Sequence, residues 1–265
     1  MCQNTYILQI YSRYMATISD GFGVWAKYPT KDSNEFYIPL DLIKDRQEIG
    51  EYSQDINRIR HIGGKVTSSN DMHFHKEILN VEATGYFKVI KNMDDISVKL
   101  RGGHHSDDGK DSARCYVFRV GADGKGKNFA KEYPHRNGKG YSWHTLSVEN
   151  LESLQDKWIG IKAITWNEGN DKVHCECYID VDGVNELGKF SPQSQKWKLW
   201  YDVVDEDGKF GENNEDHQTK GAWTDLQKNS SIQFRIDAQN GKTMKYSYRG
   251  NDVTFQLLSA REINI

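Results

Sequence analysis

Apolar and polar residues alternate strictly over several stretches of this chain. In residues 173–181 one set of positions is apolar and the other polar: Val173, Cys175, Cys177 and Ile179 alternate with His174, Glu176, Tyr178 and Asp180. A period of two is typical of an antiparallel strand with one face in a core and the other in solvent. Alternation or a β-rich composition also predicts strands at residues 21–28, 36–38, 81–91, 96–100, 115–120, 158–166, 197–203, 232–236, 253–258 and 260–263.

Turn sequences separate these predicted strands. The dipeptides that favour tight hairpin turns are Asp123-Gly124, Asp182-Gly183, Asp207-Gly208 and Asn240-Gly241. Many short strands at such spacing are typical of sandwiches and barrels. We therefore predict an all-β fold, an antiparallel two-sheet β jelly roll. Residues 20–265 would form it as a single domain, with residues 1–19 as an N-terminal extension.

Composition and charge narrow the range of partners. Hydrophobic residues make up only 37% of the chain and the mean hydropathy is −0.79, yet aromatic residues reach 12%, which is unlike a disordered chain. The formal net charge of −3 lacks the basic surplus that binding a phosphate backbone requires, so we expect no nucleic acid partner. No stretch approaches the roughly 18 apolar residues of a membrane helix, so we expect no membrane partner. An anionic ligand would need a local basic patch.

The chain has four cysteines, at Cys2, Cys115, Cys175 and Cys177. Cys175 and Cys177 lie two positions apart in a predicted strand, so they point to the same face and do not face each other. No Cys-x-x-Cys pair or cysteine–histidine zinc spacing occurs. Free structural thiols are the favoured interpretation, and a bridge from Cys115 to one of the pair is the alternative.

The segment from Arg101 to Tyr141 carries the most distinctive chemistry. Basic and aromatic hydroxyl side chains recur on both sides of the predicted strand 115–120, at Arg101, His104, His105, Lys131, Tyr133, His135 and Tyr141. Such side chains bind anionic sugars or transfer protons. If Arg101 ends one strand and Lys131 begins a later one, the two cations could meet on one face of a sheet. The alternative is a tight Gly102-Gly103 turn with histidines that serve structure or surface only.

These residue types match the needs of β-elimination from a uronic acid. A cation must neutralise the carboxylate, a base must remove the C5 proton and an acid must protonate the leaving oxygen. Arg101 suits the first role through its bidentate fork, and Lys131 could assist. The candidate bases are His104, His105 and His135, and the candidate acids are Tyr141 and Tyr133. This chemistry requires no metal or cofactor.

Three further motifs suggest binding sites. Trp223 lies in a polar stretch and is the best candidate for an exposed ring that stacks on a sugar, with Tyr133 as a further substrate contact. Oxygen ligands for a structural Ca²⁺ could come from Asp205, Asp207 and Glu212, although Asp207-Gly208 is equally a hairpin turn. His73 and His75 have the spacing to chelate zinc or copper from a strand, but no further ligand is identifiable.

Several segments resemble concanavalin A-like jelly rolls, the superfamily of laminin-G-like domains, legume-lectin-like modules and polysaccharide lyases. They are the strand Gly85–Val89, the loop Arg101–Ser106, the strand Trp158–Lys162, the hairpin Glu176–Gly183 and the closing strand Ser259–Ile263. The loop also resembles the Arg-Gly-Gly-x-His-Ser segment of a set of uncharacterised archaeal proteins. The resemblance covers residues 20–265 and implies the jelly-roll fold.

The chain departs from the catalytic motifs of two branches of that superfamily. The alginate-lyase branch carries an Arg-x-Glu-Leu strand, a Gln-x-His strand and a Tyr-Phe-Lys-Ala-Gly strand. Here Tyr86-Phe87-Lys88-Val89 lacks the Ala-Gly, and no Gln-x-His occurs. The Glu-x-Asp-x-x-Glu strand of related glycoside hydrolases is also absent. The catalytic residues of these branches therefore cannot be transferred.

Two functions remain as expectations. The first is a polysaccharide lyase that cleaves an anionic, uronic-acid glycan by β-elimination. The alternative is a non-catalytic carbohydrate-binding or adhesion module on the same fold, since a fold alone does not decide function. Either way we expect a glycan partner, a monomer and a secreted or cell-surface location, although no basic region precedes the apolar run at residues 5–10 as in a signal peptide.

Overall fold

The computed structural model describes residues 18–37, 51–55, 58–62, 71–74, 77–91, 95–102, 114–121, 129–136, 139–144, 152–206, 222–226, 230–237 and 252–265. Within these ranges the chain is almost entirely strand, and the only helical element is the short 3-10 turn η2 at Pro192–Ser194. No helix in this described part has the length and apolar character needed to cross a membrane.

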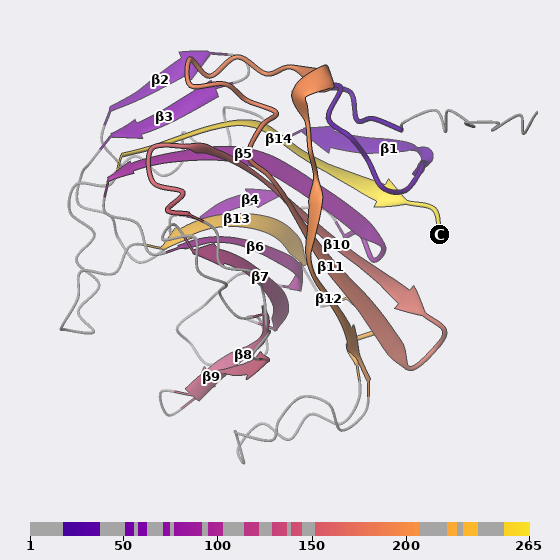
Figure 1. Ribbon diagram of the computed structural model, residues 1–265. Helices are drawn as coiled ribbons and strands as arrows, with labels where there is room; N and C mark the ends of the chain where they lie inside the picture. Colours follow the sequence, from indigo (N-terminus) through magenta and orange to yellow (C-terminus); the bar gives the residue numbers. More distant parts are fainter. Residues whose placement is uncertain are drawn as a thin grey trace, which may run out of the picture.

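The strands form two sheets, which Figure 1 shows as two layers. The eight-stranded sheet has the order β12-β11-β10-β5-β14-β3-β2, and β1 also pairs with β14. Its strands are β1 (Thr30–Tyr37), β2 (Glu51–Asp55), β3 (Arg58–Ile62), β5 (Val81–Lys91), β10 (Trp158–Glu168), β11 (Lys172–Asp180), β12 (Lys198–Asp205) and β14 (Asp252–Ile263). The six-stranded sheet has the order β4-β13-β6-β7-β8-β9. Its strands are β4 (Asp71–Phe74), β6 (Asp95–Gly102), β7 (Cys115–Gly121), β8 (Phe129–Arg136), β9 (Lys139–His144) and β13 (Ser231–Asp237).

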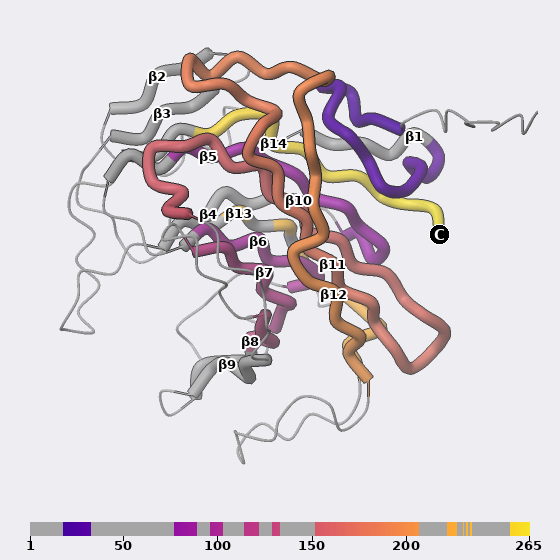
Figure 2. The backbone as a smooth tube through the Cα atoms, in the orientation of Figure 1, coloured from indigo at the N-terminus to yellow at the C-terminus, as the bar shows by residue number. Residues whose placement is uncertain are grey.

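The strand pairing confirms the predicted fold class. The described strands pair antiparallel throughout both sheets, and the sheets pack face to face as a β-sandwich jelly roll. The predicted strand at residues 81–91 is β5, and those at residues 96–100 and 173–181 correspond to β6 and β11. Figure 2 traces β10, β11 and β12 running side by side along one edge of the larger sheet.

The hydrophobic core lies between the two sheets and is built by alternate residues of each strand. Both sheets contribute fully buried aliphatic and aromatic side chains, among them Val81, Phe87, Ile161, Ile96, Val98, Phe118 and Phe234. The rings of Phe87 and Phe234 meet across the sandwich with centroids 6.0 Å apart. Since one face of each strand is used for this core, the intervening polar residues lie on the outer faces.

The prediction of a strand at residues 21–28 is wrong. Apart from an isolated bridge, this segment is irregular, and it crosses the outer face of the eight-stranded sheet. Asp20 explains the difference, because its Oδ1 accepts hydrogen bonds from the amides of Phe22 and Val24. Gly23 then adopts a φ of 79°. A local aspartate turn of this kind competes with the extended conformation that alternation favours.

Glu82 on β5 ties this crossing segment, residues 18–30, to the sheet; we call it the strap. The Glu82 carboxylate is buried, and its Oε1 accepts a hydrogen bond from Lys162 Nζ at 2.6 Å. Its Oε2 lies 2.9 Å from the Arg261 guanidinium and accepts the Lys27 amide at 3.1 Å. Burial lowers the pKa of Lys162, and the Glu82 charge opposes that shift. These contacts hold the strap residues above the outer face.

The three cysteines in the described ranges, Cys115, Cys175 and Cys177, are free and buried. This confirms the interpretation of these residues as structural thiols. Cys175 and Cys177 both point into the core, as their spacing predicted. Burial raises the pKa of the Cys175 thiol and raises that of Cys177 to about 12.

Cys175 and Cys177 should therefore resist alkylation in the folded protein. At about pH 8 both thiols stay protonated, and only the thiolate is nucleophilic. Peptide mapping after iodoacetamide treatment should find both residues unmodified in native protein and modified in denaturing urea. Modification of either residue under native conditions would contradict its burial.

Candidate functional site

Arg101 ends β6 in a conformation that turns its side chain into the sandwich. Its φ of 60° lies in the left-handed region, which is unusual for a residue other than glycine. The guanidinium donates hydrogen bonds to Thr165 Oγ1 at 3.2 Å, Asn167 Oδ1 at 2.6 Å and the Trp223 carbonyl at 3.1 Å. Arg101 is only 2% exposed, and burial lowers its pKa.

Lys131 on β8 also points into the sandwich. Its Nζ lies 2.7 Å from Asp205 Oδ2, and both side chains are essentially inaccessible to solvent. The Tyr116 hydroxyl donates to the same oxygen at 2.5 Å. Burial lowers the pKa of Lys131, and the Asp205 charge opposes the shift. This pair is therefore a buried, hydrogen-bonded ion pair.

Arg101 and Lys131 meet at Trp223. The carbonyl of Trp223 accepts from Arg101, and its ring lies 4.4 Å from Lys131 Nζ. Trp223 itself is only 5% exposed, so the prediction of an exposed tryptophan is wrong. The polar sequence around Trp223 predicted exposure, whereas the Trp223 ring packs against the core and its backbone amide donates to the Tyr116 hydroxyl. In this arrangement the two cations face the protein interior, and their predicted contact with a sugar stays a prediction.

Of the predicted calcium ligands only Asp205 lies in the described residues. Its Oδ2 is engaged by Lys131 and Tyr116, so this oxygen serves the interior network. Asp207 and Glu212 lie outside the described residues, and the calcium site stays a prediction. His104 and His105 also lie outside them. Tyr133 and His135 belong to β8 and Tyr141 to β9, and of these three residues only the backbone is described.

The backbone register places Tyr141 on the other face of the six-stranded sheet from Lys131. Tyr141 pairs with Glu132, and Glu132 meets Lys99 at 2.5 Å on the outer face. Residues opposite each other in an antiparallel pair share a face. Gln233 pairs with Lys99 on one side and with His73 on the other. By the same rule, the positions of Gln233 and His73 lie on the outer face with Lys99.

A second polar surface lies on the outer face of the eight-stranded sheet. It is a row of three alternate β11 residues, His174, Glu176 and Tyr178, which we call the β11 row. The Tyr178 hydroxyl donates to Glu176 Oε2 at 3.0 Å and accepts from Lys27 Nζ at 2.5 Å. Burial raises the pKa of Tyr178, and the nearby Glu176 charge adds to this. At the other end of the row, the His174 ring stacks on Trp166 with centroids 4.2 Å apart.

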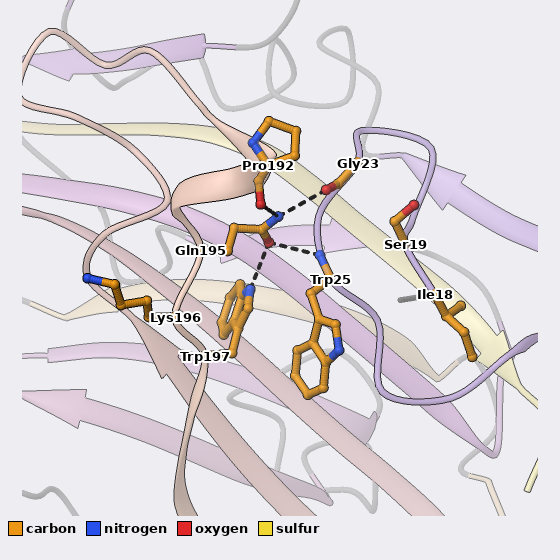
Figure 3. Close-up of a pocket in the computed structure, with 8 residues that line it drawn as sticks. All are labelled: Ile18, Ser19, Gly23, Trp25, Pro192, Gln195, Lys196 and Trp197. Atoms are coloured by element: carbon orange, nitrogen blue, oxygen red, sulfur yellow. Dashed lines mark hydrogen bonds between the residues drawn. The ribbon is translucent and has the colours of Figure 1, made fainter. Parts of the chain in front are cut away.

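A hollow of about 470 Å³ lies between the strap and the loop that precedes β12 (Figure 3). Its lining residues are Ile18, Ser19, Gly23, Trp25, Pro192, Gln195, Lys196 and Trp197. The rings of Trp25 and Trp197 are 6.4 Å apart, and Trp25 is 5.4 Å from the Tyr178 ring. The Trp25 ring therefore lies between the hollow and Tyr178 of the β11 row.

Gln195 holds the two tryptophans in place. Its Oε1 accepts from the Trp25 amide at 2.8 Å and from the Trp197 indole at 2.9 Å. Its Nε2 donates to the carbonyls of Gly23 and Pro192, as the dashed lines in Figure 3 show. One amide side chain thus uses its acceptor and both donors to fix the strap against the loop.

A buried cation lies beneath the two rings. Lys162 Nζ is 4.9 Å from the Trp197 ring and 5.6 Å from the Trp25 ring. Lys196 lies at the rim, where its side chain is 72% exposed and 3.3 Å from Asp182. The hollow therefore combines two partly exposed indole rings with one exposed lysine at its rim.

Trp25, Trp197 and the β11 row are not among the site residues predicted from the sequence. The alternation in residues 173–181 does place His174, Glu176 and Tyr178 on the polar face of a strand, and this pattern could have indicated a site on the outer face. No pattern in the sequence predicts that Trp25 or Gln195 lies near the β11 row. Their proximity depends on how the strap and the loop before β12 pack in the folded protein.

Comparisons with known proteins find only distant structural likenesses. No protein-family model matches the chain, and no curated protein matches it. A carbohydrate-binding module CBM66 from Bacillus subtilis has a TM-score of 0.40 at 11% identity, covering 80% of this chain and 91% of that chain. An endo-β-1,4-glucuronan lyase from Trichoderma reesei has 0.42 at 7% identity, covering 82% and 88%. The alginate lyase Aly36B has 0.45 at 10% identity, covering 91% and 96%. Likenesses this distant carry no information about ligand or activity.

Removing one partner of the Lys131–Asp205 pair should destabilise the protein strongly. Asp205→Ala leaves a buried ammonium uncompensated, which costs about 3–5 kcal/mol. Urea unfolding followed by tryptophan fluorescence measures the loss. Lys31→Met is the control, because its ion pair with Glu262 is exposed and should hardly change the midpoint. An Asp205→Ala midpoint as high as the control's would contradict the buried pair.

Proposed function

We propose that this protein binds a polysaccharide in the hollow between Trp25 and Trp197. The observation that supports this most is the pair of partly exposed indoles that Gln195 holds at a concave surface (Figure 3). Indole faces stack on the apolar faces of sugar rings. Because the rings are fixed before a ligand arrives, little side-chain entropy is lost on binding.

The charge around the hollow favours an anionic glycan. The chain as a whole carries a formal charge of −3, so attraction must come from local cations. Lys196 at the rim, whose side chain is 72% exposed, could approach a uronic-acid carboxylate. Attraction of this kind is screened by salt, so the affinity should fall as ionic strength rises.

Trp197→Ala should weaken glycan binding by roughly 5- to 30-fold, because loss of one stacking face removes about 1–2 kcal/mol. The measurement is isothermal titration with soluble alginate or glucuronan oligosaccharides at low salt. Leu199→Ala is the control, since Leu199 is a 52% exposed apolar residue on β12 outside the hollow lining. Equal affinities for the two variants would contradict the proposed site.

A lyase activity is the second candidate, and the outer face of the six-stranded sheet supports it. The register groups Tyr141 and Gln233 with Lys99, and His73 with Gln233. An acid, a base and an amide that can polarise a carboxylate are groups that β-elimination needs, whereas Lys99 is buried against Glu132. In this proposal Tyr141 protonates the leaving oxygen, and the base is His73 or one of His104, His105 and His135.

Tyr141→Phe should abolish glycan cleavage with little loss of glycan binding, because a proton donor acts in the transition state. Cleavage is followed by the ultraviolet absorbance of the unsaturated uronic acid that β-elimination produces. Tyr28→Phe serves as a control, because Tyr28 lies in the strap, over the outer face of the eight-stranded sheet. If the wild type yields no such absorbance on any uronic-acid polysaccharide yet binds one, the protein is a binding module and the lyase proposal fails.

A further inference from the structure

Two carboxylates lie directly opposite each other on the outer face of the eight-stranded sheet. Glu176 on β11 pairs in register with Asp202 on β12. Like charges in such cross-strand positions repel and destabilise a sheet. A cation between them would remove the repulsion, so the position calls for positive charge.

His174 completes a set of three metal-ligand types at this point. One ligand atom from each of His174, Glu176 and Asp202 lies within 4.8 Å of the others. His174 Nε2 is in direct contact with Asp202 Oδ1. The three residues come from two paired strands, whose register holds their backbones at fixed separations. Rigid neighbouring strands are a favourable scaffold for a metal site.

Outer groups orient these ligands. Glu168 Oε2 faces the other ring nitrogen of His174, Nδ1, at 3.5 Å, and Trp166 stacks on the ring. A carboxylate behind a histidine selects the tautomer that leaves Nε2 free to bind a metal. The Tyr178 hydroxyl donates to Glu176 Oε2 at 3.0 Å and fixes that carboxylate. Each inner ligand of the β11 row therefore has its own support.

We propose that His174, Glu176 and Asp202 bind one divalent transition-metal ion. An imidazole nitrogen with two carboxylate oxygens suits zinc, cobalt or nickel better than calcium, which prefers oxygen ligands alone. The Asp202 side chain is 44% exposed and that of His174 20%, so an ion can enter from solvent and water can complete its coordination. This site is separate from the predicted calcium site and does not depend on the proposed glycan function.

Lys27 is the competitor for this ion. Its Nζ lies 2.9 Å from Glu176 Oε1 and so neutralises part of the charge that would attract a metal. Lys27 belongs to the strap, which is also attached to the sheet through the Lys27 amide and Glu82. Removing the ammonium should therefore free a ligand oxygen without releasing the strap.

The experiment titrates the metal-free, 265-residue chain with Co²⁺, following its visible absorption, and with Zn²⁺ by calorimetry. We expect one equivalent of Zn²⁺ to bind and to displace Co²⁺. Asp202→Asn and His174→Gln should each weaken binding by at least about tenfold. Asp182→Asn is the matched control, because Asp182 is an aspartate with the same 44% side-chain exposure that pairs with Lys196 instead. Thermal melts verify that each variant is folded.

Lys27→Met provides the opposite test. It should strengthen Zn²⁺ binding several-fold, and unchanged or weaker binding would exclude Glu176 from the ligand set and overturn the three-ligand site. Retained Zn²⁺ affinity in both Asp202→Asn and His174→Gln would also overturn it. Loss of binding in His73→Ala instead would assign the metal to the His73 and His75 pair.

Discussion

The geometry of the outer face depends on one buried carboxylate, Glu82. It neutralises Lys162 from β10 and Arg261 from β14, and it also accepts the Lys27 amide of the strap. A charge buried without partners costs several kcal/mol, so these four groups must stay together once the sheet has formed. Because the strap is anchored there, Trp25 and the Lys27 ammonium come to lie over the β11 row, and the hollow exists only as a consequence.

The interior between the sheets contains a second set of buried charges with a different effect. Lys131 pairs with Asp205 and lies against the rings of Tyr116 and Trp223. The Trp223 carbonyl accepts a hydrogen bond from Arg101, and the Tyr116 hydroxyl donates one to Asp205. Burying such a network gains little stability over an apolar core, but each group removed alone leaves an unmatched charge. Arg101 and Lys131, which were predicted from the sequence to bind a ligand, therefore hold the two sheets in a defined relative position.

The two outer faces differ in what they can offer a ligand. The face of the eight-stranded sheet has concave aromatic surface, held by Gln195, and a row of ionisable groups whose contacts are defined. On the six-stranded sheet, the register alone groups Tyr141, Gln233 and His73 with the buried Lys99–Glu132 pair. Binding by stacking and proton transfer could thus be assigned to opposite faces, and separate variants can test each.

The sequence by itself determined the all-β class and the positions of strands such as β5, β6, β10 and β11, because alternation and turn dipeptides act over a few residues. It did not predict β2, β3, β4, β8 or β9. It also identified the buried thiols and the polar half of β11. Only the tertiary structure decided which polar residues face solvent. Arg101 turns inward through a positive φ, Trp223 is covered through Tyr116, and Trp25 reaches Trp197 across 172 positions of the chain. Which side chains are buried and which meet depends on strand register and on packing between residues far apart in the sequence. A local sequence pattern does not contain these interactions.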